Sequence, residues 1–332
     1  MSLELVAKRA RVSPATVSRV LNNLDIVKTS TRARVMKAVA ELNYHPNLHA
    51  RTLAGGQNRT LGIVMSNLEN PFFFDVFQAL EAEAHRHGYE VVAANTGYEQ
   101  EKLISGIRLM MGRRVAGLAV IVSEMDPALR DELAAGVMPV VFYDVGAPGK
   151  AITNIRVQYR KGIEKTVHFL HDLGHTRMAF IGHHAKLGPL DERKKAFLET
   201  VARYSPHVEV ITEADADGPE GGREATRQLL ASGFDPTAII CVNDFTALGV
   251  LRELRERGIR VPEEVSVTGF DNIKLSEYCY PALTTVHIPR DRIGRSVFES
   301  LVADPTRPQP PNREILIDPE FVVRESTGVA RP

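Results

Sequence analysis

The chain has 332 residues, of which 44% are hydrophobic and 25% are charged, a composition typical of a soluble globular protein. That length accommodates one small domain and one or two larger ones. No apolar run reaches the roughly 18–20 residues that a membrane-spanning helix needs. The N-terminus lacks a signal-peptide pattern, so we expect a cytoplasmic protein without a membrane partner. Two cysteines are too few for a disulfide framework, and we expect them to be buried thiols.

Charge is unevenly distributed along the chain. Residues 1–60 contain ten Lys and Arg against three Asp and Glu, a net charge of +7. Because the whole chain contains 41 Lys and Arg and 41 Asp and Glu, the remaining residues carry a net charge of −7. A basic N-terminal segment joined to an acidic remainder indicates a nucleic-acid-binding module attached to a second domain.

The first elements predict a helix-turn-helix. Residues 3–10 favour a short helix whose inward candidates are Leu5, Val6 and Ala10. Ser13 and Pro14 suit the cap and first position of a second helix, and Val17, Val20 and Leu21 share one face of it. The outward side chains are small, hydroxylated or cationic and could enter a DNA major groove: Ala15, Thr16, Ser18 and Arg19. An ordinary amphipathic helix pair is the alternative, and the basic charge favours DNA binding.

The sequence predicts a third helix after the helix-turn-helix. Thr29 or Ser30 can cap it, and Val35, Val39 and Leu42 recur at helical spacing. Three basic side chains on it are candidates for phosphate contact or for simple solvation: Arg32, Arg34 and Lys37.

Three motifs in order resemble the lactose-repressor/galactose-repressor (LacI/GalR) family of bacterial regulators. They are VSPATVSRVLN at 12–22, AELNYHPN at 40–47 and LAG at 53–55, and the resemblance runs nearly end to end. It implies a DNA-binding domain over 1–46, a hinge helix and linker over 47–59, and an effector-binding and dimerisation domain over 60–332. Within the last, subdomain 1 would span about 60–158 and 288–322, and subdomain 2 about 162–284.

The resemblance also implies the DNA contacts. Pro14 and Ala15 match operator-discriminating positions; neither can hydrogen-bond a base, but both could pack against a thymine methyl. Thr16, Ser18 and Arg19 match positions that contact bases or phosphates, and Arg19 is the candidate reader of guanine. The predicted contacts are completed by Asn22, Asn47 and Ala50. Arg11 replaces the family's usual turn glycine, at a cost of about 1 kcal/mol if φ is positive there.

Residues 47–55 predict the hinge helix. Asn47 can cap it and Gly55 can end it after about two turns. Because so short a helix is unstable alone, it should form only with DNA and a partner copy. Leu53 matches the family leucine that wedges into the minor groove. The alternative is a plain linker with a chance leucine.

From residue 60 onward, apolar runs alternate with helical segments. Strands are expected at 61–65, 90–94, 117–122, 140–143, 152–157, 178–181, 208–212, 238–242, 265–268 and 284–288. Helices are expected at 71–87, 99–113, 128–135, 162–173, 190–204, 221–232, 247–257 and from 290. This order predicts an α/β fold of two doubly wound parallel-sheet subdomains, joined by several crossings. It is similar to the periplasmic-binding-protein architecture, in which a ligand binds between the subdomains.

Side chains at strand ends are the ligand-binding candidates: Asn67, Phe72, Arg193, Asn243 and Asp271. Arginine, asparagine and aspartate supply donors and acceptors for neighbouring hydroxyls, and phenylalanine supplies a stacking face. In the family, Arg193 and Asp271 match positions that hold the sugar or purine. Ser66 and Asn272 flank these residues. Helix capping or turn-making is the favoured alternative for Asp244, and core packing the alternative for Phe73 and Phe74.

The effector class stays open between a sugar, a sugar acid and a phosphorylated sugar. A cationic loop and helix suggest an anion or merely solvated charges: His183, His184, Lys186, Lys194 and Lys195. Gln158 replaces a family aspartate that binds sugar hydroxyls, which also favours an acidic ligand. His168, His171 and His175 lack further ligands for a metal, so we predict neither metal nor cofactor.

These features predict a ligand-responsive, sequence-specific transcriptional regulator, most simply a repressor. It would bind palindromic double-stranded operator DNA as a homodimer, since the C-terminus carries no leucine heptad for a tetramer. Phosphate-loop, dinucleotide, metalloprotease and hydrolase motifs are absent, so no enzyme is expected. Control by a protein partner, or a sugar-binding receptor without a regulatory role, are the alternatives. The sequence leaves open whether the effector releases the protein from DNA, as an inducer, or promotes DNA binding, as a corepressor.

Overall fold

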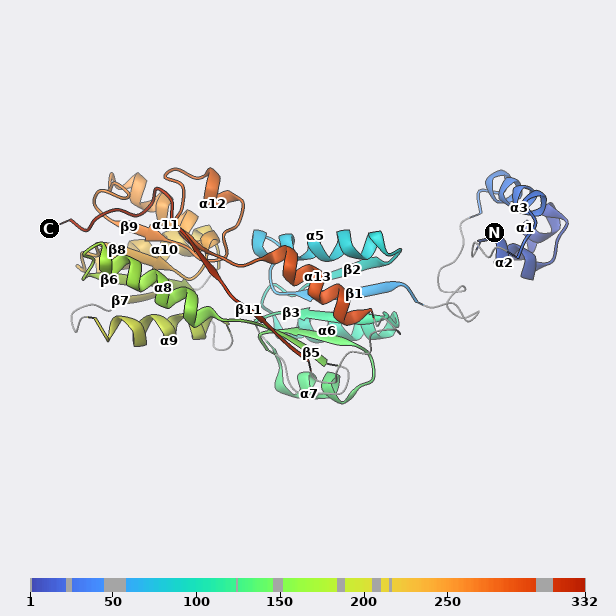
Figure 1. The fold of residues 1–332 in the computed structure, drawn as a ribbon, viewed down its shortest axis with the longest axis horizontal. Coiled ribbons are helices and arrows are strands. Elements are labelled where there is room, and N and C mark those ends of the chain that lie inside the picture. Colours follow the sequence, from blue (N-terminus) through green and yellow to red (C-terminus); the bar gives the residue numbers. More distant parts are fainter. Residues whose placement is uncertain are drawn as a thin grey trace. The chain divides into compact units, whose positions relative to one another are not determined.

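A computed structural model describes residues 2–21, 26–44, 58–123, 125–145, 152–183, 189–204, 210–214, 217–302 and 313–331. The chain forms two compact units, Met1–Asn58 and Arg59–Pro332, and each is described by itself (Figure 1). No helix among these described residues is both long and apolar enough to cross a membrane.

The N-terminal unit is a three-helix bundle, as the sequence predicts. Its helices are α1 (Leu3–Ala10), α2 (Pro14–Leu21) and α3 (Thr29–Glu41). They enclose a small apolar core whose most deeply buried members are Val6, Val17, Val20 and Val35. The turn between α1 and α2 holds Arg11 at φ 53° and ψ 50°, in the left-handed region. The position therefore has the positive φ that favours glycine, and Arg11 occupies it at a conformational cost.

Two details of this unit differ from prediction. Leu5 is 49% exposed, and Ala7 lies in the core instead, because α1 turns its Val6–Ala7–Ala10 face inward. Neither Thr29 nor Ser30 caps α3, because both already lie within its first turn. Lys28 occupies the cap position without a side-chain hydrogen bond.

The second unit begins with a six-stranded parallel sheet. Its strands are β1 (Thr60–Met65), β2 (Glu90–Asn95), β3 (Gly117–Ile121), β4 (Val140–Tyr143), β5 (Ile152–Val157) and β11 (Arg313–Ile317). They lie in the order β11-β5-β4-β3-β1-β2, and every pair is parallel.

Helices cover both faces of this sheet (Figure 1). They are α5 (Pro71–Arg86) and α13 (Arg290–Leu301) on one face, and α6 (Gln100–Gly112) and α7 (Pro127–Ala135) on the other. The alternation of a strand explains both cores: Leu61, Ile63 and Met65 pack toward α5, whereas Val64 packs toward α6. We call this sheet with its four helices lobe 1.

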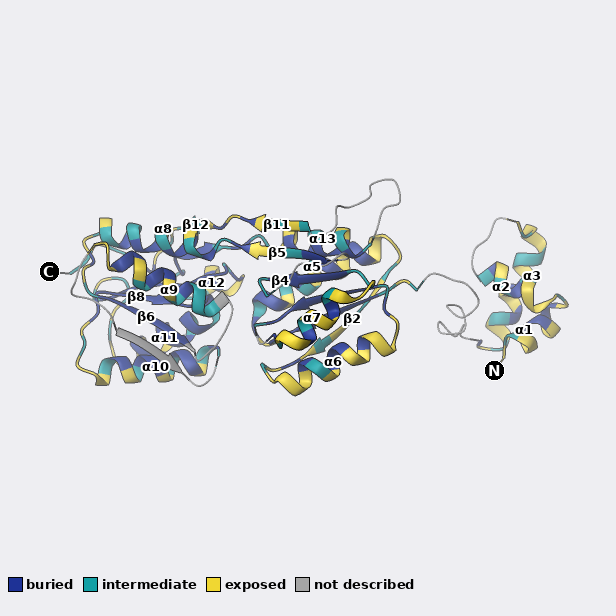
Figure 2. Ribbon diagram, turned by 90° about the horizontal axis from the view of Figure 1, so that it is seen from below, coloured by how far each residue is buried: buried dark blue, intermediate teal, exposed yellow. Residues whose placement is uncertain are grey.

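Lobe 2 repeats the design on a four-stranded parallel sheet in the order β7-β6-β8-β9. Its strands are β6 (Met178–His183), β7 (Val210–Ala214), β8 (Ala238–Cys241) and β9 (Ser266–Thr268). One face carries α8 (Tyr159–Asp172) and α9 (Pro189–Val201), and the other carries α10 (Pro219–Ala231) and α11 (Asp244–Glu256). Buried residues follow the strands and the inward helix faces of both lobes (Figure 2). The predicted doubly wound fold is confirmed.

Within the described ranges, the chain crosses between the lobes at three places. These lead from β5 into α8, from β10 (Thr285–His287) into α13, and from β11 to β12 (Glu320–Val322). Strands β10 and β12 pair antiparallel. Beyond β12, Val267 N–H donates to the Ser326 carbonyl at 2.8 Å, so the C-terminal segment packs against lobe 2. The sequence did not predict β11, β12 or the short α12 (Leu275–Tyr278).

Helices α10 and α11 approach so closely that only glycine fits at their contact. A Cβ added at Gly249 would overlap the Pro219 carbonyl, and one added at Gly222 would overlap the Thr246 carbonyl. We expect Gly249→Ala to lower the free energy of unfolding of the second unit by about 1–3 kcal/mol or more. Urea unfolding followed by circular dichroism measures this change.

Gly112→Ala, at the end of α6, is the matched control, because nothing lies within 4 Å of its added Cβ. There we expect a gain of roughly 0.5–1 kcal/mol from helix propensity. Equal effects of the two substitutions would contradict the close packing of α10 and α11.

Candidate functional site

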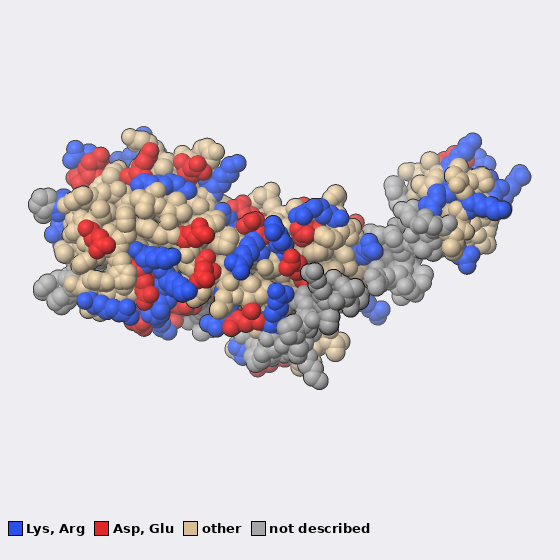
Figure 3. Space-filling view, viewed as in Figure 1, with Lys and Arg blue, Asp and Glu red and all other residues tan. Residues whose placement is uncertain are grey.

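Helix α2 presents the predicted DNA-reading face. Pro14, Ala15 and Arg19 are exposed, and Thr16 and Ser18 are partly exposed. The Thr16 N–H donates to Ser13 Oγ at 3.2 Å, which confirms Ser13 as the cap, and the two hydroxyls lie 2.9 Å apart. Lys and Arg side chains predominate over acidic ones on the visible face of this unit (Figure 3). The surface is therefore suited in shape and charge to DNA.

The other predicted DNA contacts fall on residues that the structure does not describe. They are Asn22, Asn47, Ala50 and Leu53, together with the rest of the predicted hinge helix. Their roles stay predictions.

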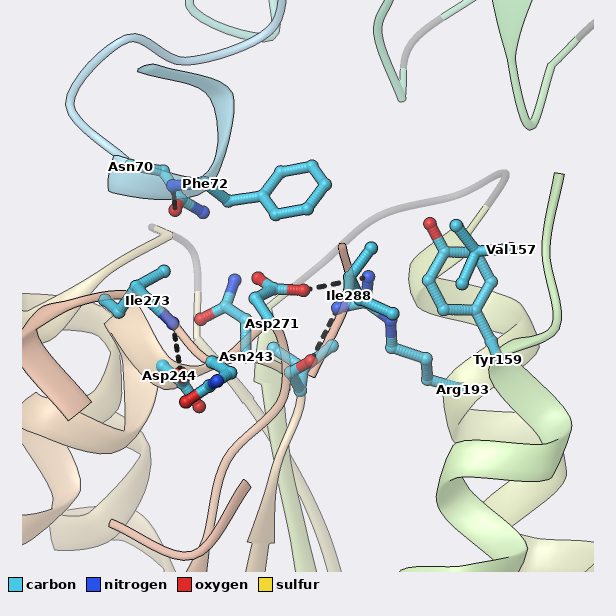
Figure 4. A network of polar contacts seen from close by, with 12 residues as sticks. Asn70, Phe72, Val157, Tyr159, Arg193, Asn243, Asp244, Asp271, Ile273 and Ile288 are labelled. Atoms are coloured by element: carbon cyan, nitrogen blue, oxygen red, sulfur yellow. Dashed lines mark hydrogen bonds and ion pairs between the residues drawn. The ribbon is translucent and has the colours of Figure 1, made fainter. Parts of the chain in front are cut away.

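The second unit contains a pocket of about 420 Å³ between its lobes. Lobe 1 and its crossing segment provide Asn70, Phe72, Phe73, Tyr98, Val122, Ser123, Tyr143 and Tyr159, and lobe 2 provides Leu190, Arg193, Asn243 and Asp271. Four of the five predicted ligand residues therefore lie here: Phe72, Arg193, Asn243 and Asp271. Figure 4 shows Phe72 across the pocket from Asn243 and Asp271.

Asn67, the fifth predicted ligand residue, does not line this pocket. Its Oδ1 accepts from the Glu69 N–H at 2.9 Å, and its Nδ2 donates to Asp217 at 3.4 Å. Among the flanking candidates, Ser66 is buried, with its Oγ accepting from the Ser123 N–H at 2.9 Å. The Asn272 side chain is directed to Arg324 and His287 rather than to the pocket.

Arg193 is held rigidly at the base of the pocket. Its Nη1 donates to the Val242 carbonyl at 2.6 Å, and its Nη2 lies 3.6 Å from Asp271 Oδ1. The guanidinium also packs over the Tyr159 and Phe270 rings, 4.4 Å from each centroid. A side chain that is only 5% exposed keeps its charge here because a carboxylate and two aromatic faces compensate it.

Asp271 follows β9 in an unusual backbone conformation. It has φ 104° and Asn272 has φ 53°. Arg290 stabilises this turn by donating to the carbonyls of both residues, while its Nε pairs with Asp75 of α5 at 3.0 Å. Burial raises the pKa of Asp271 to about 6, with the Arg193 and Arg290 cations acting in the opposite direction.

Among the described residues, two buried side-chain atoms of the pocket have no hydrogen-bond partner. They are Arg193 Nε, a donor, and Asp271 Oδ1, an acceptor. A buried polar atom without a hydrogen bond costs about 1–3 kcal/mol. The arrangement is therefore suited to a small molecule that brings both a donor and an acceptor.

Asn243 and Asp244 have different functions. Asn243 Oδ1 caps α11 by accepting from the Thr246 N–H at 2.7 Å, and its Nδ2 donates to Asp217 Oδ1 at 3.3 Å. Asp244 is fully buried and accepts from the Ile273 N–H at 2.8 Å and the Thr285 hydroxyl at 2.5 Å. Burial raises its pKa to about 8. Asp244 therefore fastens the segment after β9, which agrees with the favoured structural interpretation.

A network of hydrogen bonds joins Tyr143, Asp144 and Tyr159 beside Arg193. The Tyr159 hydroxyl donates to Asp144 Oδ2 at 2.6 Å and lies 3.0 Å from the Tyr143 hydroxyl. The Val157 N–H donates to Asp144 Oδ1 at 2.9 Å. Burial raises the pKa of Asp144 to about 7, and the hydrogen bonds from Tyr159 and Val157 oppose that rise.

One argument for an acidic ligand does not hold, and the described residues test the other only in part. The Gln158 amide donates to Asp318 at 2.5 Å and is not among the pocket-lining residues. Lys195 pairs with Asp191 at 2.6 Å, so its charge is already matched. The His184 and Lys186 side chains, and that of His183, lie outside what the structure describes.

The histidines of α8 have structural contacts. His171 and His168 pack against the Tyr204 ring, and His175 Nε2 lies 3.0 Å from the Gly328 carbonyl and 3.1 Å from Ser266 Oγ. Among the described residues, no group of three or more His, Cys, Asp or Glu is placed to hold a metal ion.

Sequence reasoning missed several pocket residues. Ser123 and Tyr143 come at the ends of β3 and β4, so the rule that identified Asn243 and Asp271 could have found them. Tyr159 follows β5 and Asp217 follows β7, so the same rule could also have found them. Arg290, which begins α13 after a crossing, carries no such signal.

The raised pKa of Asp144 predicts a pH effect on stability. The folded state favours the protonated form of the Asp144 carboxyl. The stabilisation that this protonated form gives the fold is therefore complete below about pH 4 and is lost as the pH rises through 7. We expect Asp144→Asn, which cannot ionise, to lose less stability than the unmodified protein between pH 5 and pH 8. Urea unfolding at both pH values measures this difference. Asp131→Asn, at an exposed position, is the control, and identical pH dependence in all three proteins would contradict the assignment.

Comparison with known proteins agrees with this geometry. Residues 2–47 match the lacI family of bacterial regulatory proteins, and residues 167–327 match the periplasmic binding protein-like domain. The HTH-type transcriptional repressor PurR of Vibrio vulnificus is 35% identical over 325 residues, which cover 97% of both chains. PurR of Vibrio cholerae is 35% identical over 324 residues, covering 97% of this chain and 96% of that protein.

Solved structures give the same result. A lac repressor dimer bound to operator and the anti-inducer ONPF superposes with a TM-score of 0.83 at 28% identity, covering 99% of each chain. A LacI-family regulator from Silicibacter pomeroyi superposes with a TM-score of 0.85 at 26% identity over the full length of both chains. The relatives are repressors rather than enzymes. The chain therefore belongs to the LacI family of bacterial regulators, as a DNA-binding transcriptional repressor that responds to an effector.

Proposed function

We propose that this repressor binds a palindromic operator as a homodimer and is controlled by a neutral sugar, a small ring bearing several hydroxyl groups, held between the lobes. The observation that carries the proposal is the pair of buried, unsatisfied atoms, Asp271 Oδ1 and Arg193 Nε. A sugar hydroxyl is both a donor and an acceptor, so neighbouring hydroxyls can satisfy the two atoms together.

The rest of the pocket is suited to a sugar ring. Phe72 offers an apolar face opposite the polar groups of lobe 2, and such a face packs against the C–H surface of a sugar (Figure 4). Asn243 adds an amide on the same side as Asp271. An aromatic face with a few convergent polar groups fixes both the orientation of a ring and the pattern of its hydroxyls.

Charge favours a neutral compound over a sugar acid or a phosphorylated sugar. Among the described pocket-lining residues, Arg193 is the cation, and Asp271 already opposes it. Asp144, which is hydrogen-bonded to Tyr159 beside this pair, is an acidic side chain and supplies no positive charge for an anionic ligand. An anionic effector would therefore enter a site whose positive charge is already compensated.

The switch would operate through the lobes. An effector that binds one lobe arrangement better shifts the population toward it, and the crossing segments pass this change to lobe 1. Lobe 1 follows directly from the predicted hinge helix, which would insert Leu53 at the centre of the operator. Two copies would place two α2 helices in successive major grooves.

Selection from a random duplex library tests this function. We expect a palindrome with a flexible central step, whose enrichment falls at high salt and changes with neutral sugars but not with sugar acids or phosphorylated sugars. An enriched palindrome that no sugar pool alters would overturn the effector assignment. Enrichment of a single half-site would overturn the dimer.

Leu53→Ala is expected to weaken operator binding while leaving effector binding intact. The wedge supplies the kink on which the central contacts depend, and loss of a buried leucine side chain costs roughly 2–5 kcal/mol. Fluorescence anisotropy on the selected duplex measures the operator affinity. Leu48→Ala, in the same segment, is the control variant, and unchanged affinity in Leu53→Ala would contradict the hinge-wedge role.

Asp271→Asn and Arg193→Ala are expected to abolish the effector response while operator binding is retained. Asp271→Asn is the milder change, because it keeps the size of the side chain and one acceptor oxygen. Arg156→Ala removes an exposed arginine paired with Glu314 and serves as the control. Operator release by the effector, measured in each variant, decides the question, and a normal response in Asp271→Asn would place the effector elsewhere.

A further inference from the structure

Asp217 lies at the edge of the effector pocket, immediately before α10 of lobe 2. Its Oδ1 accepts from the Gly218 N–H at 2.8 Å and from Asn243 Nδ2 at 3.3 Å. Both partners belong to lobe 2, so these contacts fix the carboxylate on that lobe.

The other carboxylate oxygen reaches lobe 1. The Tyr98 hydroxyl donates to Asp217 Oδ2 at 2.7 Å, and Asn67 Nδ2 donates to the same oxygen at 3.4 Å. Tyr98 follows β2 and Asn67 follows β1, so a single side chain joins the ends of two lobe 1 strands to the start of a lobe 2 helix.

The local structure holds the Asp217 carboxylate in place. Gly218 has φ 87°, and a Cβ there would lie 2.6 Å from Phe245 Cε1, so only glycine allows this approach. Helix α10 then runs for 13 residues, and its N-terminal dipole favours a negative charge at this position. Hydrogen bonds to a charged acceptor are the stronger kind, which makes the contact to Tyr98 a substantial one.

We infer that Asp217 is a positioning residue that ties the two lobes together across the pocket. Tyr98 and Asn243 both line the pocket and both donate to Asp217, one from each lobe. The carboxylate thereby sets the spacing and orientation of these two side chains. This inference concerns the proposed effector pocket but does not depend on the identity of the effector.

Hydrogen exchange of the full-length protein without effector tests the inference. Asp217→Ala is expected to increase amide exchange at 66–70 and 96–99 in lobe 1. The increase is about tenfold, as expected for losing a hydrogen bond to a charged acceptor. Tyr98→Phe, which removes only the hydroxyl, is expected to increase exchange at 217–222 in lobe 2. Since Asp217→Ala already removes the bond that Tyr98→Phe removes, the double variant should not exceed Asp217→Ala by much.

Glu220→Ala is the matched control, because it removes an acidic side chain from the first turn of the same helix without a contact across the lobes among the described hydrogen bonds. It should alter exchange near α10 alone. Asp217→Asn, which keeps an acceptor oxygen, should recover part of the protection in lobe 1. The urea midpoint of each variant separates lobe opening from global unfolding.

Increased exchange confined to 217–222 and 243–246 in Asp217→Ala would show a local capping role and overturn the inference. Additive effects of Asp217→Ala and Tyr98→Phe would also overturn it. Neither result bears on the sugar assignment, because no effector is present.

Discussion

The pocket depends on one buried ion pair, Arg193 with Asp271. A guanidinium at this depth would be prohibitively costly without compensation. The surrounding side chains supply that compensation: Asp271 supplies the opposing charge, Val242 a carbonyl acceptor, and Tyr159 and Phe270 two aromatic faces. Removing one of these partners leaves the Arg193 charge partly uncompensated in an apolar interior. The packing of the pocket and the charge that it offers a ligand therefore depend on the same residues.

Backbone strain places the acidic groups. Asp271 and Asp144 both have positive φ, 104° and 59°, at the ends of β9 and β4. Such conformations cost of order 1–3 kcal/mol for non-glycine residues and persist only where the surroundings enforce them. Here Arg290 holds the Asp271 carbonyl, and the Val157 N–H holds the Asp144 carboxylate. Asp271 is thereby placed beside Arg193, and Asp144 accepts from Tyr159, whose ring packs against the Arg193 guanidinium.

Hydrophobic periodicity predicts most of the fold, and strand-end reasoning with the family resemblance selects four residues that line one pocket, out of five candidates for ligand binding. They succeed because parallel strands deliver their carboxyl ends to one edge, so Asn243 and Asp271 converge without knowledge of the tertiary contacts. They miss β11 and β12, which are short and lie on crossing segments. They also miss Arg290, which follows β10 at a crossing rather than a strand of either parallel sheet, and they miss Tyr159 and Asp217 although both follow parallel strands. Gln158 shows the opposite error: its position implied a pocket residue, but hydrogen bonding to Asp318 directs its amide elsewhere.

The most direct test of this account is a crystal structure of the protein with the compound that alters operator binding. The account predicts a neutral sugar whose hydroxyls lie within hydrogen-bond distance of Asp271 Oδ1 and Arg193 Nε, with its ring against Phe72. A compound bound outside this pocket, or one bound here without contact to Asp271 and Arg193, would contradict it.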